Sequence, residues 1–323
     1  MNNQIRVSVV VPCYNHAKFI GTRINSILSQ SYRNFEIIIL DDCSTDDSRE
    51  VIETFRNNPM VSNLVFNSKN SGSTFVQWNK GISMAKGELI WIAESDDSAS
   101  TDFLEKCVSV FNGNPDLAVC YTQSLMIDNN DNVTGNLLWW TNERDEKRWL
   151  NSFVNKGADE VRCFMAFQNT IMNASSALFR KQFYLECGGA PEYMKLCGDW
   201  VLWMKLSILG DVAYIAEPLN RYRFHNTTVR SSTERNSLVF WETQDARHTA
   251  LQLTGYSSKT YQIIQNRIVS EWKNYLLSDG YSDVLNKYFK SFFSLLKYYN
   301  LLFLLKMSMK ILFGRFAGNK NGN

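Results

Sequence analysis

Short apolar runs alternate with amphipathic stretches along the first part of this chain. Val7–Val11 and Phe35–Leu40 are almost wholly apolar and rich in β-branched residues, which is typical of strands buried on both faces of a parallel sheet. Between them, apolar residues recur at helical spacing, at Ile20, Ile24, Ile27 and Leu28. The pattern predicts a strand, a helix and a second, parallel strand.

The same alternation continues to residue 110. We expect a helix at Ser48–Phe55, a strand at Leu64–Phe66, a helix at Phe75–Lys86 that Gly87 ends, and a strand at Leu89–Ala93. Later elements are less regular. They are a strand at Ala118–Tyr121, a polar loop or insertion at Asp128–Lys156, a helix at Trp200–Leu209, a strand at Val212–Ala216 and polar helices across residues 231–278. The order predicts an α/β fold followed by a helical extension.

Composition narrows the class of protein. Of 323 residues, 45% are hydrophobic and 20% are charged, which indicates a folded chain, and the net charge of +2 argues against a dedicated nucleic-acid binder. The seven cysteines are scattered without a C-x-x-C pair, so neither a zinc site nor a disulfide framework is indicated. Val7–Val11 is too short for a signal-peptide core. We expect a cytoplasmic protein.

The C-terminal residues form a basic, amphipathic tail. From Val284 onward there are seven Lys or Arg and no Asp or Glu, so the preceding residues are net acidic. Apolar residues are spaced to share one helical face, at Phe289, Phe292, Phe293, Leu296, Phe303 and Met307. The longest apolar run, Tyr298–Leu305, is interrupted by Asn300 and is too short to span a bilayer. The tail either lies on an anionic membrane surface or packs on the protein or a second subunit, as in a homodimer.

Acidic residues follow two of the predicted parallel strands. Asp41 and Asp42 come directly after one, and Glu94, Asp96 and Asp97 after another. Because ligands of open α/β sheets bind at the carboxyl ends of the strands, both clusters are expected in one crevice. A cation would offset their repulsion, which predicts a Mg²⁺ or Mn²⁺ and diphosphate site.

Each acidic group also has a plainer interpretation. The first is a strand-to-helix turn capped by Ser44 or Asp46, the second is a solvated loop, and Asp199 is the N-cap of the helix at Trp200–Leu209. Other functional motifs are missing. The sequence contains no G-x-G-x-x-G, P-loop, G-x-S-x-G or H-E-x-x-H pattern, which disfavours nicotinamide, P-loop, hydrolase and zinc-protease chemistry.

Several motifs occur in a familiar order. The chain resembles the family 2 glycosyltransferases with a GT-A fold over residues 5–226. The blocks that carry this resemblance are Val7–Asn15, Ser26–Tyr32, Leu40–Ser48, Asn79–Ile82, Ala85–Glu88, Glu94–Asp97, and Gly198–Trp200 with Leu202 and Trp203. The resemblance implies a mixed, mostly parallel sheet. It also implies a donor-binding half at 1–110, an acceptor-binding and catalytic-base half at 111–228, a helical extension at 229–285 and the basic tail at 286–323.

The resemblance also implies roles for individual residues. Pro12, Tyr14 and Asp42 would line the nucleoside pocket, with Asp42 accepting a hydrogen bond from the base. Asp96 would lie near the donor ribose or the metal, Asp97 would bind the metal, and Asp199 would be the general base. In the Y-R-x-H element at 222–225, Arg223 or His225 would approach the diphosphate or the metal.

The chain departs from the family pattern at three positions. Cys43 replaces a usual Gly, Glu94 replaces the usual first Asp, and Trp78 stands where many relatives have a basic residue. These departures leave every carboxylate of the expected site in place. Donor contacts near Trp78 are the part of the pattern that they change.

The expected activity is a metal-dependent, inverting transfer from a nucleoside-diphosphate sugar, with UDP favoured. The acceptor would be a hydroxyl of a glycan or lipid-linked glycan in surface polysaccharide synthesis, at the inner face of the cytoplasmic membrane. Two alternatives remain open. One is a non-catalytic scaffold subunit at the membrane, and the other is a sugar nucleotidyltransferase, although the glycine-rich basic loop of that class is missing.

Overall fold

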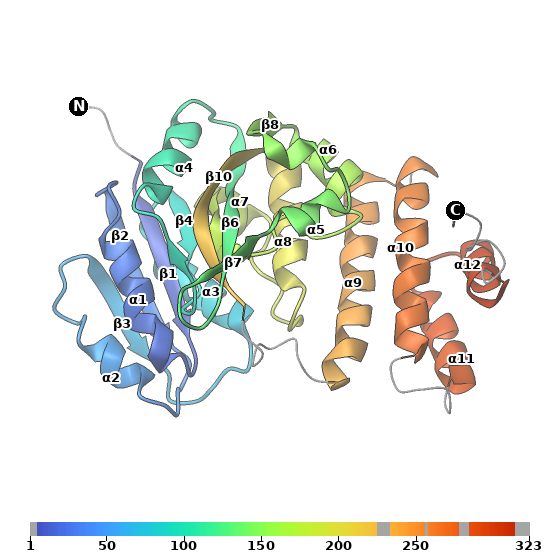
Figure 1. Cartoon of the computed structure of the whole chain (residues 1–323), viewed down its shortest axis with the longest axis horizontal. Helices are drawn as coiled ribbons and strands as arrows, with labels where there is room; N and C mark the ends of the chain where they lie inside the picture. Colours follow the sequence, from blue (N-terminus) through green and yellow to red (C-terminus); the bar gives the residue numbers. More distant parts are fainter. Residues whose placement is uncertain (1–4, 225–232, 256–257, 278–283, 314–323) are drawn as a thin grey trace.

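The computed structural model describes residues 5–224, 233–255, 258–277 and 284–313 (Figure 1). One ten-stranded sheet runs through it in the order β3-β2-β1-β4-β9-β6-β10-β5, with β7 paired to β6 and β8 to β10. The strands are β1 (Val7–Cys13), β2 (Phe35–Asp41), β3 (Val61–Phe66), β4 (Leu89–Ile92), β5 (Ser98–Ala99), β6 (Leu117–Ile127), β7 (Val133–Asn136), β8 (Phe153–Asn155), β9 (Ala177–Arg180) and β10 (Asp211–Arg223).

Helices cover both faces of this sheet. The α-helices before the extension are α1 (Ala17–Leu28), α2 (Ser48–Glu53), α3 (Thr74–Met84), α4 (Phe103–Asn112), α5 (Leu138–Asn142), α6 (Gly157–Glu160), α7 (Lys181–Glu186) and α8 (Gly198–Leu209). Neighbouring residues of β1 point to opposite faces because side chains alternate along a strand. Val9 packs in the cluster that contains α1 and α4, whereas Val10 packs in the cluster that contains α3 and α8.

The first four strands are parallel and confirm the predicted α/β fold. β1 pairs with β2 and β4, and β2 pairs with β3, all in parallel. All seven residues of β1 and of β2 are buried, as their continuous apolar runs predict. These strands therefore deliver their carboxyl ends to one edge of the sheet.

The middle of the chain differs from the expectation of a long loop at Asp128–Lys156. It contains β7, α5, a 3₁₀ turn at Arg148–Leu150 and β8. Trp149 anchors this region because it is buried and its indole N–H donates to the Tyr121 hydroxyl at 2.8 Å. β9 runs antiparallel between β4 and β6 and joins the two parallel parts of the sheet. The spacing of apolar residues along the sequence did not predict β9 or α4.

The extension consists of helices that stack beside α8 at one end of the molecule (Figure 1). They are α9 (Thr233–Thr254), α10 (Ser258–Leu277), α11 (Val284–Leu295) and α12 (Leu301–Phe313). The first two confirm the predicted helices. No helix among the described residues is long and apolar enough to cross a membrane.

The tail both packs on the protein and exposes apolar side chains. Met307 is fully buried, whereas Phe289 and Phe293 are more than half exposed. A turn at residues 296–300 separates α11 from α12, so the apolar residues of the two helices do not share the single face that their spacing predicts. The buried residues of the tail pack on the protein, and its exposed apolar residues leave the membrane and second-subunit alternatives open.

Candidate functional site

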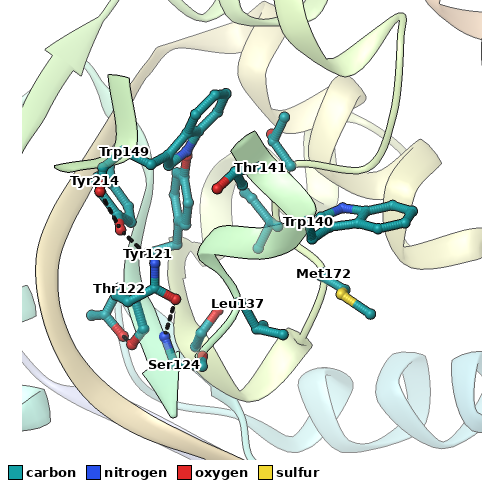
Figure 2. Close-up of a pocket in the computed structure, with 13 residues that line it drawn as sticks. Tyr121, Thr122, Ser124, Leu137, Trp140, Thr141, Trp149, Met172 and Tyr214 are labelled. Atoms are coloured by element: carbon teal, nitrogen blue, oxygen red, sulfur yellow. Dashed lines mark hydrogen bonds between the residues drawn. The ribbon is translucent and has the colours of Figure 1, made fainter. Parts of the chain in front are cut away.

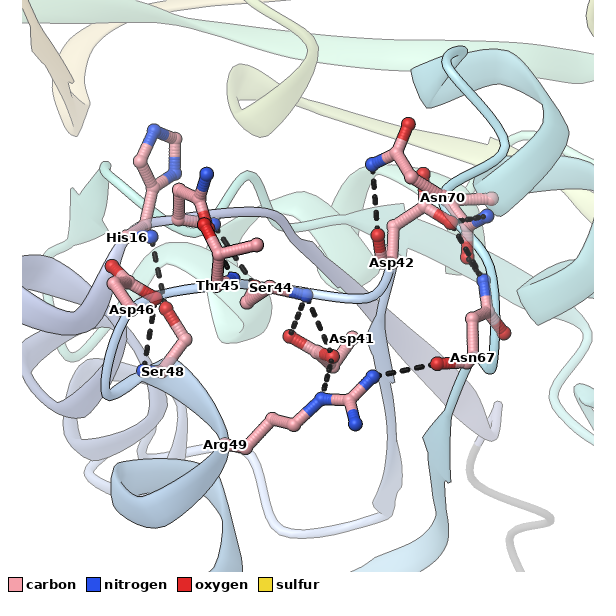
Figure 3. Close-up of polar contacts among 12 residues, drawn as sticks. His16, Asp41, Asp42, Ser44, Thr45, Asp46, Ser48, Arg49, Asn67 and Asn70 are labelled. Carbon is pink, nitrogen blue, oxygen red and sulfur yellow. Dashed lines mark hydrogen bonds and ion pairs between the residues drawn. The ribbon is translucent and has the colours of Figure 1, made fainter.

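Two turns at the carboxyl edge of the sheet are tied together (Figure 3). The Asn15 side-chain oxygen accepts the backbone N–H of Thr45 at 2.7 Å, and the backbone N–H of Asn15 donates to the Ser44 hydroxyl at 3.0 Å. Asn15 and Cys43 both have left-handed backbone conformations, with φ of 56° and 63°. Glycine, which the family pattern predicts at position 43, adopts this conformation without steric cost. Cys43 adopts it here, so this departure falls at a position that favours glycine.

Asp41 has a structural role and lies outside the expected crevice. It is fully buried, accepts the Nε–H of Arg49 at 2.7 Å and accepts the backbone N–H of Ser44 (Figure 3). Asp46 accepts the backbone N–H of Ser48 at 3.0 Å. Both carboxylates thus belong to a hydrogen-bonded turn, as in the plainer interpretation, but the N-cap of α2 is Asp47 without a side-chain cap and is neither Ser44 nor Asp46.

Asp42 is held in place by a different set of donors. Its carboxylate accepts hydrogen bonds from Asn67 Nδ2 at 2.7 Å, from Gln77 Nε2 at 2.8 Å and from the backbone and hydroxyl of Ser71 at 3.0 and 2.8 Å. Such a surrounded carboxylate has one fixed orientation. Pro12 is buried on β1 beside Leu40, and Tyr14 follows β1 with nearly half of its surface exposed. The three nucleoside-pocket candidates thus lie at the ends of two adjacent strands.

The second acidic cluster follows β4. Asp97 is buried, and its two oxygens accept the backbone N–H of Arg223 at 2.9 Å and the side-chain amide of Asn173 at 2.8 Å. Burial, with a smaller contribution from Asp96, raises the pKa of Asp97 to about 6. Asp96 is partly exposed. Two neighbouring carboxylates of different accessibility therefore stand at this strand end.

Two of the three departures from the family pattern contact each other. The indole N–H of Trp78 donates to Glu94 Oε1 at 2.8 Å, and Trp78 itself is buried. Burial and the neighbouring charge of Asp96 raise the pKa of Glu94 to about 8. Trp78 therefore gives Glu94 an uncharged hydrogen-bond donor, and Glu94 is a carboxylate that binds its proton tightly.

Buried guanidinium groups offset the acidic cluster. Arg223 is buried, donates from Nε to the backbone oxygen of Asp96 at 2.7 Å and forms an ion pair with Asp131. Arg23 is also buried, and its guanidinium lies 4.7 Å from the centre of the Trp91 ring. Burial lowers the pKa of Arg23 to about 10, with the charges of Asp97 and Glu94 opposing that shift. Arg223 thus fixes the backbone of the loop that carries Asp96 and Asp97.

Asp199 lies in the first turn of α8 and is mostly buried. Its Oδ2 accepts the side-chain amide of Asn169 at 2.9 Å, and its Oδ1 accepts the backbone N–H of Trp200 at 2.8 Å. The N-cap of α8 is Cys197, without a side-chain cap. Asp199 is therefore not the N-cap that its position before Trp200 suggests.

Two short segments bring the predicted residues together. On α3, Gln77 contacts Asp42 and the adjacent Trp78 contacts Glu94. Between α6 and β9, Asn169 contacts Asp199 and Asn173 contacts Asp97. Sequence reasoning missed all three amide side chains, because isolated amides have no periodicity and their partners lie up to 76 residues away.

The residues present fit a divalent cation, although they do not form a complete cage. No group of three or more His, Cys, Asp and Glu close enough to hold a metal ion occurs among the described residues. Asp96 and Asp97 supply hard oxygen ligands, and a carboxylate has lone pairs for more than the two hydrogen bonds that Asp97 accepts from Arg223 and Asn173. Such a site is completed by substrate phosphates. His225 lies outside the described residues.

A small cavity adjoins the segment that carries Asn169 and Asn173, because Met172 is among the residues that line it (Figure 2). Its volume is about 20 Å³, and Tyr121, Trp140, Trp149 and Tyr214 are among the residues that line it. The Gln123 amide bridges from the backbone of Ser124 to the Tyr214 hydroxyl at the cavity wall. That volume holds about one water molecule and no sugar ring. The cavity is therefore part of the packing that supports the site.

Comparison with known protein families shows to which family this chain belongs. The model described as glycosyl transferase family 2 matches residues 8–174, just over half of the chain. The chain belongs to this family. The matched residues include both acidic strand ends and the Asn169–Asn173 segment.

Named relatives of this family 2 chain match it over about a third of its length. The chain is 43% identical over 101 residues to glycosyltransferase GlyG of Streptococcus pneumoniae, a match that covers 31% of this chain and 33% of GlyG. It is 35% identical over 105 residues to the poly(ribitol-phosphate) beta-N-acetylglucosaminyltransferase TarS of Staphylococcus aureus. That match covers 31% of this chain and 18% of TarS. The chain thus spans a third or less of these relatives.

Solved structures share the fold of this family 2 chain. S. aureus TarS in complex with UDP-GlcNAc superposes with a TM-score of 0.58 at 17% identity, covering 85% of this chain and 81% of that one. The mannosyltransferase PcManGT from Pyrobaculum calidifontis, in complex with GDP-Man and Mn²⁺, superposes with a TM-score of 0.57 at 15% identity. This superposition covers 97% of this chain and 89% of PcManGT. At these identities the likeness concerns the fold, and it confirms the GT-A fold class.

Proposed function

We propose that this protein transfers a sugar from a nucleoside-diphosphate sugar, with UDP favoured, to a hydroxyl group of a glycan or lipid-linked glycan during cell-surface polysaccharide synthesis. The observation that carries the proposal is the Asn169–Asn173 segment, which contacts both Asp97 and Asp199. A donor-side acid and a base candidate are thereby held at one site. Family membership and the names of the relatives support the same reaction class.

The proposed reaction is a single displacement. Asp199 takes the proton of the acceptor hydroxyl, the acceptor oxygen bonds to the anomeric carbon, and the bond from that carbon to the diphosphate oxygen breaks. The electron pair of the broken bond leaves with the nucleoside diphosphate, and the anomeric configuration inverts. A product that retains the configuration would contradict this scheme.

The donor would bind along the carboxyl edge of β1 and β2. Tyr14, Pro12 and Asp42 would surround the nucleoside, and Asp42 would accept a hydrogen bond from the base in exchange for one of its present donors. Asp96 and Asp97 would hold Mn²⁺ or Mg²⁺, which when bound neutralises charge on the leaving diphosphate. Arg223 would keep the loop of these two acids in place, because its Nε donates to the backbone oxygen of Asp96 and its backbone N–H donates to the Asp97 carboxylate.

The tail would bring the enzyme to its acceptor. Exposed apolar residues on α11 and α12, including Phe289, Phe293 and Leu302, are accompanied by exposed Lys290 and Lys306. Basic surfaces with exposed apolar side chains bind anionic lipid headgroups. We therefore place the protein at the inner face of the cytoplasmic membrane, where a lipid-linked glycan is accessible.

Calorimetric titration with UDP, GDP, CDP and dTDP, with and without Mn²⁺, tests the donor site directly. We expect one nucleotide to bind selectively in the presence of Mn²⁺, and Asp97→Asn to lose the Mn²⁺-dependent part of its affinity. Asp159→Asn, in an exposed position on α6, is the matched control. If no nucleotide binds under either condition, the scaffold alternative replaces this proposal.

A further inference from the structure

Helix α9 of the extension carries two buried charged side chains, Glu242 and Arg247. Only 5% of Glu242 and 1% of Arg247 is exposed. Buried charges are costly unless they are paired or hydrogen-bonded, so the partners of these two side chains indicate what they are for. Both sets of partners lead to Asp199.

Glu242 binds the loop that precedes α8. Its Oε1 accepts the backbone N–H of Lys195 at 2.7 Å, and its Oε2 accepts the backbone N–H groups of Leu196 and Cys197, each at 2.8 Å. Asp199 follows two residues after Cys197. Hydrogen bonds from backbone N–H groups to a carboxylate are charge-assisted and strong, and the carboxylate also favours the positive end of α8.

Arg247 binds the other segment that reaches Asp199. Its Nη2 donates to the backbone oxygen of Phe167 at 3.3 Å, and its guanidinium lies 5.5 Å from the centre of the Trp200 ring. Glu271 of α10 forms an ion pair with Arg247 and fixes its orientation. Two residues after Phe167, Asn169 donates to Asp199.

Besides the contact with Arg247 at Phe167, a second set of hydrogen bonds fixes the turn at Asn169. The indole N–H of Trp140 donates to the backbone oxygen of Asn169 at 2.6 Å, and the Gln168 amide donates to the backbone oxygen of Trp140 at 2.6 Å. A displacement at Phe167 is therefore transmitted to Asn169 and to the carboxylate that it contacts.

We propose that Glu242 and Arg247 are positioning residues for Asp199, so that the helical extension takes part in sugar transfer. The inference rests on the proposed function, in which Asp199 is the base. Glu242 fixes the backbone that carries Asp199, and Arg247 fixes the backbone that carries the Asn169 amide. A shift of about 1 Å in a catalytic group costs roughly 10²-fold in rate.

The experiment compares the full-length wild type with Glu242→Gln and Arg247→Met. Glu242→Gln keeps the shape of the side chain but replaces one acceptor oxygen with an NH₂ group that faces backbone N–H donors. We expect the turnover number for nucleoside-diphosphate release from a panel of UDP-, GDP-, CDP- and dTDP-linked hexoses, with water as acceptor, to fall by about 10- to 100-fold. The affinity for the nucleoside diphosphate should change less than twofold.

Amide hydrogen exchange supplies a readout that does not need the substrate. In Glu242→Gln, exchange at Lys195, Leu196 and Cys197 should accelerate by about tenfold because their acceptor is weakened. Asp245→Asn is the control, since Asp245 lies on the same helix and contacts Lys297 of the tail. It should leave both exchange at 195–197 and turnover unchanged.

The outcomes separate this inference from the proposed function. If the wild type releases nucleoside diphosphate and Glu242→Gln turns over equally fast, Glu242 is merely structural and the inference is wrong. The same conclusion follows if turnover and nucleotide affinity fall in parallel, because that pattern reports general unfolding. A wild type that neither binds nor releases a nucleoside diphosphate contradicts the proposed function itself, and exchange at residues 195–197 then still reports whether Glu242 holds the loop before Asp199.

Discussion

At the residue scale, the site is built from carboxylates with very different surroundings. Asp41 is neutralised by Arg49, Asp42 is surrounded by uncharged donors, and Glu94 receives a single hydrogen bond from Trp78. A carboxylate therefore has a structural role at Asp41, whereas Asp42, the next residue, is the one to which the proposed function gives a chemical role. The environment of each carboxylate, rather than its place in a motif, separates these roles.

The first prediction concerns Glu94 and pH. Between about pH 8 and pH 4.5 the folded chain binds more protons at Glu94 than the unfolded chain does, since burial raises the pKa from 4.5 to about 8. Stability falls with rising pH wherever the folded state binds more protons. Glu94→Gln should therefore be more stable than the wild type at pH 8.5, and this advantage should shrink towards pH 5.

Thermal unfolding of the metal-free proteins between pH 5 and pH 8.5 measures this difference. Glu186→Gln, at an exposed position on α7, is the control and should track the wild type at every pH. A Glu94→Gln advantage that stays constant across the range would show that Glu94 is ionised throughout.

The second prediction concerns Asp199. Asp199→Asn preserves the volume of the side chain but removes the proton acceptor, and positioned base catalysis contributes about 10²–10⁴-fold. Transfer should fall by at least the lower figure, while calorimetry shows unchanged nucleotide binding because the donor-side residues lie on other elements. Near-normal transfer by this variant would remove Asp199 from the role of base.

At the scale of elements, α3 and α8 meet at the centre of the site. Gly198 opens α8 directly against Phe75 of α3, and Phe75 packs edge-on against Trp78 with ring centres 5.1 Å apart. A Cβ at Gly198 would lie 2.6 Å from Phe75 Cε2. The close approach requires glycine, and it links the helix that carries Asp199 to the residue that contacts Glu94.

Gly198→Ala should therefore displace the start of α8. Overpacking of a buried contact typically costs about 1–3 kcal/mol, and we expect a loss of unfolding free energy in that range together with reduced transfer. Gly113→Ala is the matched control, because a Cβ there meets its nearest atom only at 4.0 Å. Chemical denaturation and a transfer assay measure both effects, and full activity of Gly198→Ala would show that α8 tolerates the shift.

At the scale of the whole molecule, the parallel strands β1, β2 and β3 lie at one end and the helical extension at the other (Figure 1). The extension supports the site through α9 and exposes apolar side chains on α11 and α12. Truncating the tail would also remove the buried Leu295, Leu304 and Met307 and uncover the part of the core that they pack against. Surface substitutions are therefore the cleaner probe of membrane binding.

The prediction at this scale is that the tail carries membrane affinity. The full-length protein should sediment with phosphatidylglycerol vesicles and much less with phosphatidylcholine vesicles, and the difference should shrink in high salt as charges are screened. Replacing Phe289, Phe293 and Leu302 by Gln should abolish sedimentation, whereas Leu185→Gln, an exposed leucine on α7, should not. Equal partitioning of the triple variant would reject the membrane surface as the partner of the tail.

The sequence by itself determined the α/β fold and the strand ends where Asp42, Asp96 and Asp97 stand. It could do so because continuous apolar runs indicate buried parallel strands, and parallel strands end at one edge. Only the tertiary structure decided that Asp41 pairs with Arg49 and that Glu242 holds the loop before Asp199. Such contacts join residues that are distant in the chain, and a hydrogen bond between them depends on packing that no local spacing records.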